Sequence, residues 1–137
     1  MKKIWTNGCF DILHIGHIKM LQYARSLGDN LIVGIDSDQR VKQLKGTSRP
    51  VNNQDDRREF LLSLGCVDDV FVFDSKEEMC TILVEQGIRE LVVGEDYIDR
   101  EVTGEEIVER IHYFAKVEGY STSKIIPTIK EKQIWDK

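Results

Sequence analysis

Hydrophobic and polar positions divide the chain into short strand-like runs and longer stretches with helical spacing. Apolar and β-branched residues dominate the runs 2–6, 31–36, 67–73 and 88–93. Between them, apolar residues recur every three or four positions in 18–27, 38–44, 54–64 and 76–86. Strands that alternate with helices form right-handed βαβ units and a parallel sheet covered on both faces. The pattern therefore predicts an α/β, Rossmann-like three-layer sandwich in a single domain, residues 1–137.

Polar residues that can cap a helix stand directly before three of the helical stretches. They are Ser37, Asn53 and Ser75, and glycines stand where two of these helices should end, at 46 and 87. We therefore expect helices to begin at positions 38, 54 and 76. In the stretch 54–64, Phe60, Leu61 and Leu64 are expected to face the core.

Length, composition and charge narrow the class of protein. A chain of 137 residues can bury one core without disulfides or a metal, and its three cysteines share no metal-ligand spacing. The formal net charge of −5 argues against a general nucleic-acid binder. No apolar run reaches membrane length, and the amino end lacks the apolar region of a signal peptide. We therefore expect a cytoplasmic protein with neither a nucleic acid nor a membrane as partner.

The most informative chemistry lies in the segment 6–17, between the first strand and the first helix. In an open parallel sheet this loop lies at the carboxyl edge, where ligands bind. Gly8 and Gly16 permit close backbone approach, and His14 and His17 stand three residues apart where the helix begins. Because a helix start presents unpaired N–H groups, it favours an anion, and two imidazoles add further donors. The segment therefore predicts a polyphosphate site.

The order of residues in this segment, Thr-Asn-Gly-Cys-Phe-Asp-Ile-Leu-His-Ile-Gly-His, resembles the signature of nucleotidyltransferases that share a His-x-Gly-His motif. It is most similar to the adenylyltransferase branch of ADP-heptose synthesis, and the glycerol-3-phosphate cytidylyltransferases are close cousins. The resemblance implies that the two histidines are catalytic. It also implies that the nucleotide is bound by Gly8, Cys9, Phe10 and Gly16.

The region 102–115 allows two interpretations. Ile107, Val108, Ile111 and Phe114 fit one face of a helix. The resemblance instead implies a last strand at 110–114, in a stretch rich in β-forming residues. We favour a short helical piece at 104–108 followed by that strand, which makes the predicted parallel sheet five-stranded.

A second motif of the same family is found at 117–126. Its Gly-x-Ser-Thr-Ser core resembles Gly-x-Ser-Thr-Thr, which in the family lines the nucleotide pocket at a helix start. Hydroxyls and N–H groups at such a start complement phosphate oxygens. The residues implied to bind the nucleotide are Glu118, Gly119, Tyr120, Ser121, Thr122 and Ser123. Ser121 is then expected to cap a final helix that Pro127 kinks or restarts.

The loop 41–52 resembles the family's lysine-glycine loop, in which a lysine reaches the transferring phosphates. Lys45 is that lysine here, and a lysine beside a glycine can move in once the nucleotide has bound. The residues implied to contact the acceptor are Asp11, Arg49, Arg57 and Asp96. Alternatives stay open: a solvated basic loop for Lys45 and Arg49, a surface ion pair for Arg57, and a carboxylate that stabilises a turn for Asp11 and for Asp96.

These features predict an enzyme that transfers a nucleoside monophosphate from an NTP to a sugar phosphate and releases pyrophosphate. ATP and D-glycero-β-D-manno-heptose 1-phosphate are the favoured substrates, because the Lys-Gly-x-x-Arg-Pro loop resembles the ADP-heptose branch. The alternatives are a glycerol-3-phosphate cytidylyltransferase that uses CTP, a non-catalytic nucleotide-binding module and a fragment of an aminoacyl-tRNA synthetase. Mg²⁺ is expected to be carried by the nucleotide phosphates, with no metal site on the protein itself. The resemblance also implies a homodimer.

Overall fold

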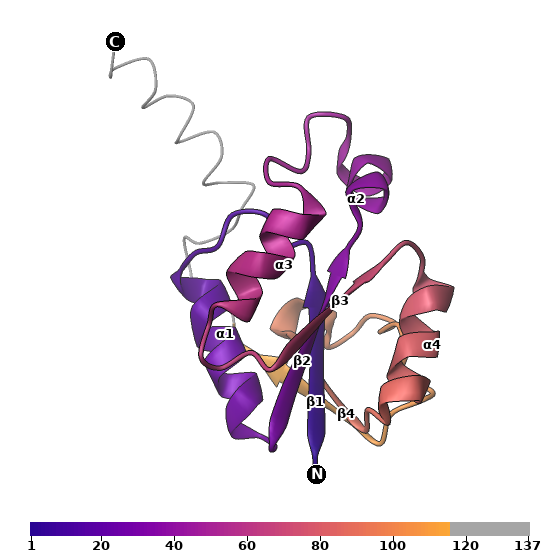
Figure 1. The fold of residues 1–137 in the computed structure, drawn as a ribbon. Coiled ribbons are helices and arrows are strands. Elements are labelled where there is room, and N and C mark those ends of the chain that lie inside the picture. The colour runs from indigo at the N-terminus through magenta and orange to yellow at the C-terminus, as the bar shows by residue number, and fades with distance from the viewer. Residues whose placement is uncertain (116–137) are drawn as a thin grey trace.

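A computed structural model of the chain describes residues 1–115, so the predicted helix cap at Ser121 and the effect of Pro127 lie outside the described residues. All five described strands are parallel and form one sheet in the order β3-β2-β1-β4-β5 (Figure 1). The strands are β1 (Lys3–Gly8), β2 (Asn30–Asp36), β3 (Asp69–Phe73), β4 (Glu90–Gly94) and β5 (Arg110–Phe114). The predicted α/β class and the five-stranded parallel sheet are confirmed.

Helices cover both faces of this sheet and give the three layers. Helices α1 (Ile15–Ser26) and α3 (Gln54–Leu62) pack on one face, and α4 (Lys76–Gln86) packs on the other (Figure 1). The short helix α2 (Asp38–Lys45) follows β2 at the carboxyl edge of the sheet. Within residues 1–115, no helix has the length and apolar character that crossing a membrane would require.

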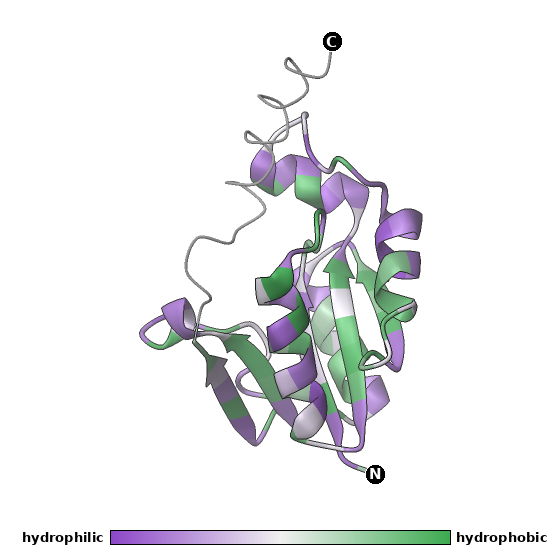
Figure 2. Cartoon of the chain, turned by 90° about the vertical axis from the view of Figure 1, so that its left-hand side faces the viewer, coloured by the Kyte–Doolittle hydropathy of each residue, from purple (hydrophilic) through white to green (hydrophobic). Residues whose placement is uncertain are grey.

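Successive strand residues point to opposite faces, so the sheet separates two core clusters. Ile4 and Val33 pack with residues of α1 and α3 in the first cluster. Trp5 and Ile32, their immediate neighbours in sequence, pack with residues of α4 in the second. Figure 2 shows the central strands as predominantly hydrophobic and the outer helix surfaces as predominantly hydrophilic. Gly34 is required on β2, because a Cβ there would lie 2.1 Å from the buried Trp5 ring.

The predicted caps of α2, α3 and α4 are confirmed. Ser37, Asn53 and Ser75 each accept a hydrogen bond from a backbone amide three residues on, at 3.2, 2.9 and 3.1 Å. The expectation for Phe60 is wrong, since this side chain is 48% exposed. A nine-residue helix buries one narrow stripe, and in α3 that stripe consists of Arg57 and Leu61.

The strand predicted at 110–114 is confirmed as β5, but the short helix predicted at 104–108 is wrong. This segment forms turns, in which the Ile107 and Val108 amides donate to the Gly104 carbonyl at 2.9 and 3.3 Å. Gly104 has a φ of +91° and lies so close to α4 that a Cβ would be 2.6 Å from Leu83 Cδ1. A left-handed residue pressed against α4 cannot continue a right-handed helix.

The strand order creates a switch point between β1 and β4. The chain proceeds from β1 outward to β2 and β3, and then returns to the other side of β1 for β4 and β5. Backbone pairing between β1 and β4 covers two residue pairs, Ile4 with Glu90 and Trp5 with Leu91. Beyond them, the Thr6 hydroxyl donates to the Val92 carbonyl at 2.9 Å. Open α/β sheets bind ligands outside the carboxyl ends of the strands at such a switch point.

Candidate active site at the carboxyl edge of the sheet

The loop after β1 enters α1 through a reciprocal cap made by two histidines. His14 is the N-cap residue, and its Nδ1 accepts a hydrogen bond from the Gly16 amide at 3.0 Å. In return, Nδ1 of His17 accepts from the His14 amide at 3.2 Å. The two rings stack with their centroids 3.8 Å apart. The arrangement is a capping box in which two imidazoles replace the usual hydroxyl and carboxylate.

These caps determine which nitrogen of each imidazole carries the proton. A neutral imidazole has one N–H donor and one lone pair, and here both Nδ1 lone pairs accept backbone hydrogen bonds. The hydrogen-bond pattern therefore assigns the proton of each ring to Nε2. His14 and His17 thus bring two Nε2–H donors to the amino end of α1, where the helix dipole also favours an anion.

Burial keeps both rings neutral near pH 7. Desolvation, with smaller contributions from the charges of His14 and Lys45, lowers the pKa of His17 to about 4. Desolvation also lowers the pKa of His14. A phosphate bound here would therefore meet N–H donors of neutral imidazoles rather than a pair of imidazolium cations.

A strained residue shapes the loop below the histidines. Phe10 has a φ of +50°, which is uncommon for a residue other than glycine, and it is buried. Its ring lies 5.3 Å from the His17 ring, centroid to centroid. Gly8 leaves room for it, since a Cβ there would lie 3.2 Å from Phe10 Cε2. Such a conformation persists where the surrounding structure holds it, which is common at ligand sites.

Lys45 is the last residue of α2, on the same edge of the sheet. Its side chain is exposed, and its charge acts on both His17 and Cys9, so the ammonium lies near the loop. Burial raises the pKa of the Cys9 thiol, and the charges of Lys45 and Arg57 only partly offset this. Cys9 is therefore a protonated, buried residue of the loop, and Lys45 is an exposed positive charge near it.

Asp11 ties this loop to the segment 49–52. Its carboxylate is fully buried and accepts hydrogen bonds from the amides of Val51 and Asn52, each at 2.8 Å, and from Arg49 Nε at 3.3 Å. The Asn52 side-chain amide donates back to the Asp11 carbonyl at 2.7 Å. These contacts lie inside the protein and resemble the turn-stabilising alternative more than direct contact with an acceptor. The sequence analysis missed Asn52, for which the only signal was its place after the Arg-Pro pair.

Arg57 holds three segments of the carboxyl edge together from below. Its guanidinium donates to the carbonyls of Cys9 at 2.9 Å, Asp36 at 2.8 Å and Asn52 at 3.0 Å. It also forms an ion pair with the Asp38 carboxylate at 2.8 Å. The side chain is 0% exposed, so the alternative of a surface ion pair is wrong. Burial also directs every one of these contacts into the protein, which indicates a positioning role rather than contact with an acceptor.

Of the remaining predicted residues, Asp96 follows β4 on the other side of the switch point, and the others lie outside the described residues. Asp96 lies in the 3₁₀ turn η1 (Glu95–Tyr97), directly after β4, and its Oδ1 folds back over Gly94. It is exposed at the same edge as the histidine loop. Glu118, Gly119, Tyr120, Ser121, Thr122 and Ser123 lie outside the described residues.

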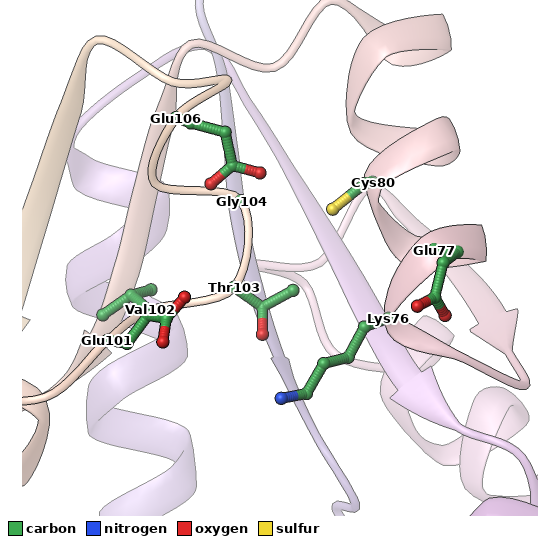
Figure 3. A pocket seen from close by; sticks show the side chains of 8 residues that line it. All are labelled: Lys76, Glu77, Cys80, Glu101, Val102, Thr103, Gly104 and Glu106. Atoms are coloured by element: carbon green, nitrogen blue, oxygen red, sulfur yellow. The ribbon is translucent and has the colours of Figure 1, made fainter.

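A separate hollow of about 490 Å³ lies between α4 and the segment 101–106 (Figure 3). Glu77, Cys80 and Glu106 line it, and burial together with these two carboxylates raises the pKa of the thiol. The thiol is therefore a poor nucleophile. Across residues 1–115, no three His, Cys, Asp or Glu side chains are grouped so that they could hold a metal ion.

The fold and this edge define a three-layer α/β domain with a histidine-capped first helix at the switch point of its sheet. Residues 5–133 match the model of one family, and the chain accordingly belongs to the cytidylyltransferase-like family of nucleotidyltransferases. The predicted family is confirmed.

Curated relatives cover nearly the whole chain. It is 48% identical over 136 residues to the bifunctional protein HldE of Campylobacter concisus, which is 99% of this chain and 29% of that protein. It is 50% identical over 131 residues to HldE of Helicobacter pylori, and 49% identical over 133 residues to HldE of Campylobacter jejuni. These two matches cover 94% and 96% of this chain, and 28% of each relative. The chain thus spans less than a third of the length of these relatives.

A solved structure shares the fold. It is the lipopolysaccharide core biosynthesis protein of Thermoplasma volcanium, with a TM-score of 0.70 and 22% sequence identity. The match covers 86% of this chain and 99% of that chain. At this identity the likeness supports the fold assignment only.

Proposed function

We propose that the chain catalyses nucleotidyl transfer, in which an NTP and a sugar phosphate give a nucleotide sugar and pyrophosphate. The observation that carries this proposal is the reciprocal cap, because it directs the Nε2–H donors of His14 and His17 away from their own helix. They stand at the amino end of α1, at the switch point of the sheet. This is a binding arrangement for the phosphates of a nucleotide.

The chemistry requires positioning and charge stabilisation rather than an activated nucleophile of the protein. The acceptor phosphate is already ionised at neutral pH and attacks the α-phosphorus in line with the departing pyrophosphate. Negative charge then increases on the α-phosphoryl group and on the leaving group. His14 and His17 donate to these oxygens, and Lys45 at the end of α2 stabilises the developing charge.

The remaining residues divide into a nucleotide side and an acceptor side. Gly8 at the end of β1, Cys9 and Phe10 after it, and Gly16 in the first turn of α1 belong to the segment over which the nucleotide lies. The hydroxyls of Ser121, Thr122 and Ser123, with Glu118, Gly119 and Tyr120, secure it. On the acceptor side, Asp96 at the end of β4 faces the same edge, and Asp11 and Arg57 act by holding the loops in place. Mg²⁺ enters with the nucleotide phosphates.

The favoured substrates are ATP and D-glycero-β-D-manno-heptose 1-phosphate. Support comes from the Lys-Gly-x-x-Arg-Pro loop and from 48–50% identity to three proteins named HldE. CTP with glycerol 3-phosphate is the second pair, because the family includes such enzymes. We also propose a homodimer, as the resemblance implies, and a cytoplasmic location.

A substrate panel tests this function. The chain is incubated with Mg²⁺, each of the four NTPs and a set of sugar and polyol phosphates, and released pyrophosphate is measured. We expect the fastest release with ATP and the heptose 1-phosphate. Faster release with CTP and glycerol 3-phosphate would replace the substrates but keep the reaction class. No release with any pair would contradict nucleotidyl transfer and favour a non-catalytic nucleotide-binding module.

A further inference from the structure

Arg49 has a buried nitrogen for which residues 1–115 provide no hydrogen-bond partner. Its side chain is 12% exposed, and Nε contacts Asp11 Oδ2 at 3.3 Å. Nη2 is fully buried, and it is the one buried side-chain nitrogen or oxygen among residues 1–115 that has no partner. An unpartnered buried donor is destabilising, and donors of this kind in native proteins call for a functional explanation.

The ion pair with Asp11 does not provide hydrogen-bond acceptors for all the donors of this guanidinium. The Asp11 carboxylate is mainly occupied by the amides of Val51 and Asn52, whose contacts at 2.8 Å are shorter than the 3.3 Å contact with Arg49. Asp11 therefore holds one side of the guanidinium and fixes its orientation. Residues 1–115 supply no acceptor for the Nη2 side.

The position of Arg49 identifies the kind of group that is missing. Asp11 belongs to the loop that carries His14 and His17, so the guanidinium lies beside the proposed phosphate site. Lys45 lies four residues earlier, on the same edge of the sheet. Guanidinium groups bind phosphate oxygens through directed N–H donors, and a burial that excludes water strengthens such a contact.

The geometry points to Arg49 as a substrate-binding residue whose Nη2 donates to a phosphate oxygen, with Asp11 as the residue that positions it. This inference rests on the proposed function in one respect, namely that a phosphate-bearing substrate binds at this edge. The phosphate can belong to the acceptor or to the nucleotide, and the two sources differ in which ligand loses affinity when Arg49 is replaced.

Equilibrium binding tests the inference without requiring turnover. Binding of three probes, Mg²⁺-ATP, inorganic pyrophosphate and D-glycero-β-D-manno-heptose 1-phosphate, is measured by titration calorimetry for the wild type, R49Q and R49K. Because the lost contact is a charge-assisted hydrogen bond, we expect R49Q to weaken at least one probe by about tenfold or more. R49K keeps the charge but not the forked geometry, so it should recover only part of the loss.

A matched control comes from the opposite edge of the sheet. Arg89 directly precedes β4 and is 75% exposed in an ion pair with Glu109. R89Q removes the same charge far from the histidine loop, and we expect it to bind all three probes within about twofold of the wild type. Melting temperatures show that each variant is folded. If R49Q does not fold, R49K carries the test.

The outcomes separate the two claims. Loss of ATP and pyrophosphate binding in R49Q places the contact on the nucleotide, and loss of sugar phosphate binding alone places it on the acceptor. Wild-type affinity for all three probes in folded R49Q would overturn the inference, as would a wild type that binds none of them. If the substrate panel gives no pyrophosphate while Arg49-dependent binding is found, the proposed function fails and the inference stands.

Discussion

The two edges of the sheet both carry buried charge, but within residues 1–115 only the carboxyl edge has the features of an active site. At the amino edge, Glu90 accepts from Lys2 at 2.8 Å and pairs with His112 at 2.6 Å. A hollow of about 580 Å³ also lies there, lined in part by Arg89 and Glu109. These groups satisfy one another. Charge and a hollow are therefore not sufficient evidence of a site.

At the carboxyl edge the buried charged groups have a different role. The Asp11 carboxylate and the Arg57 guanidinium are fully buried and are used to join loops that are far apart in the sequence. The histidine caps direct two Nε2–H donors outward, and Arg49 keeps an unpartnered nitrogen. Imidazole and guanidinium donors above a buried network that joins distant loops therefore distinguish the carboxyl edge from the amino edge.

Removing the Arg57 guanidinium, which joins the loops of the carboxyl edge, should have the largest effect on stability. Arg57→Met keeps the length of the side chain but leaves three carbonyls and the Asp38 carboxylate without their donor. We expect the free energy of unfolding in urea to fall by about 3–5 kcal/mol. The control is Arg58→Met on the same helix, where one contact to the Val70 carbonyl is lost and about 1 kcal/mol is expected. Equal losses in the two variants would show that Arg57 has no special role.

Removing the Nε2–H donors of His14 and His17 while keeping the helix caps should have the next largest effect, in this case on turnover. The side-chain oxygen of an asparagine takes the place of Nδ1, so His14→Asn and His17→Asn retain an acceptor for the backbone amides but lose Nε2–H. Each should reduce turnover about a hundredfold or more. The melting temperature, read by circular dichroism, should change little. Full activity in both variants would restrict the histidines to a structural role.

Acid should lower the free energy of unfolding through His17, at the carboxyl edge. Because burial lowers the pKa of this imidazole to about 4 in the folded chain, the unfolded chain binds more protons below its ordinary pKa near 6.5. The stabilisation is therefore complete above pH 6.5 and is lost as the pH falls from 6.5 toward 4. Urea titrations across this window should show a smaller loss of stability in His17→Asn. Identical pH dependence in the two proteins would contradict the buried, neutral imidazole.

The smallest effect is expected at the amino edge. The hydrogen bonds from His112 and from Lys2 lower the pKa of the Glu90 carboxyl, so this contribution to stability is present above the ordinary carboxyl pKa and is lost as the pH falls through the lowered value. Lys2 is 46% exposed, so Lys2→Met should cost less than about 1 kcal/mol and leave turnover unchanged. A loss of turnover would remove the contrast between the two edges.

The sequence was most informative where local rules decide the outcome. The strand runs and the caps Ser37, Asn53 and Ser75 follow from residues near in sequence, and the structure confirms them. Phe60 and Arg57 could not be placed in this way, because the buried stripe of α3 depends on which helix face meets β2 and β3. Periodicity favours the phenylalanine for the core. The three carbonyls that satisfy Arg57 come from segments that only the fold brings together.

The candidate site shows the same division. The two histidines were recognised from the order of residues around them, but their reciprocal caps, which assign the proton to Nε2, required coordinates. Likewise, Arg49 was predicted from its loop, and its unpartnered Nη2 is a property of the packed structure.

The central claim is that His14 and His17 are neutral and present Nε2–H donors to a nucleotide. Long-range proton–nitrogen NMR of the two imidazoles tests it most directly. In the free protein near pH 7, the spectra should show both rings neutral, with the proton on Nε2 and an unprotonated Nδ1. Addition of Mg²⁺-ATP should shift the Nε2 signals of His14 and His17 and leave the Nδ1 pattern of the caps intact. A proton on Nδ1, or Nε2 signals that do not respond to saturating nucleotide, would contradict the account.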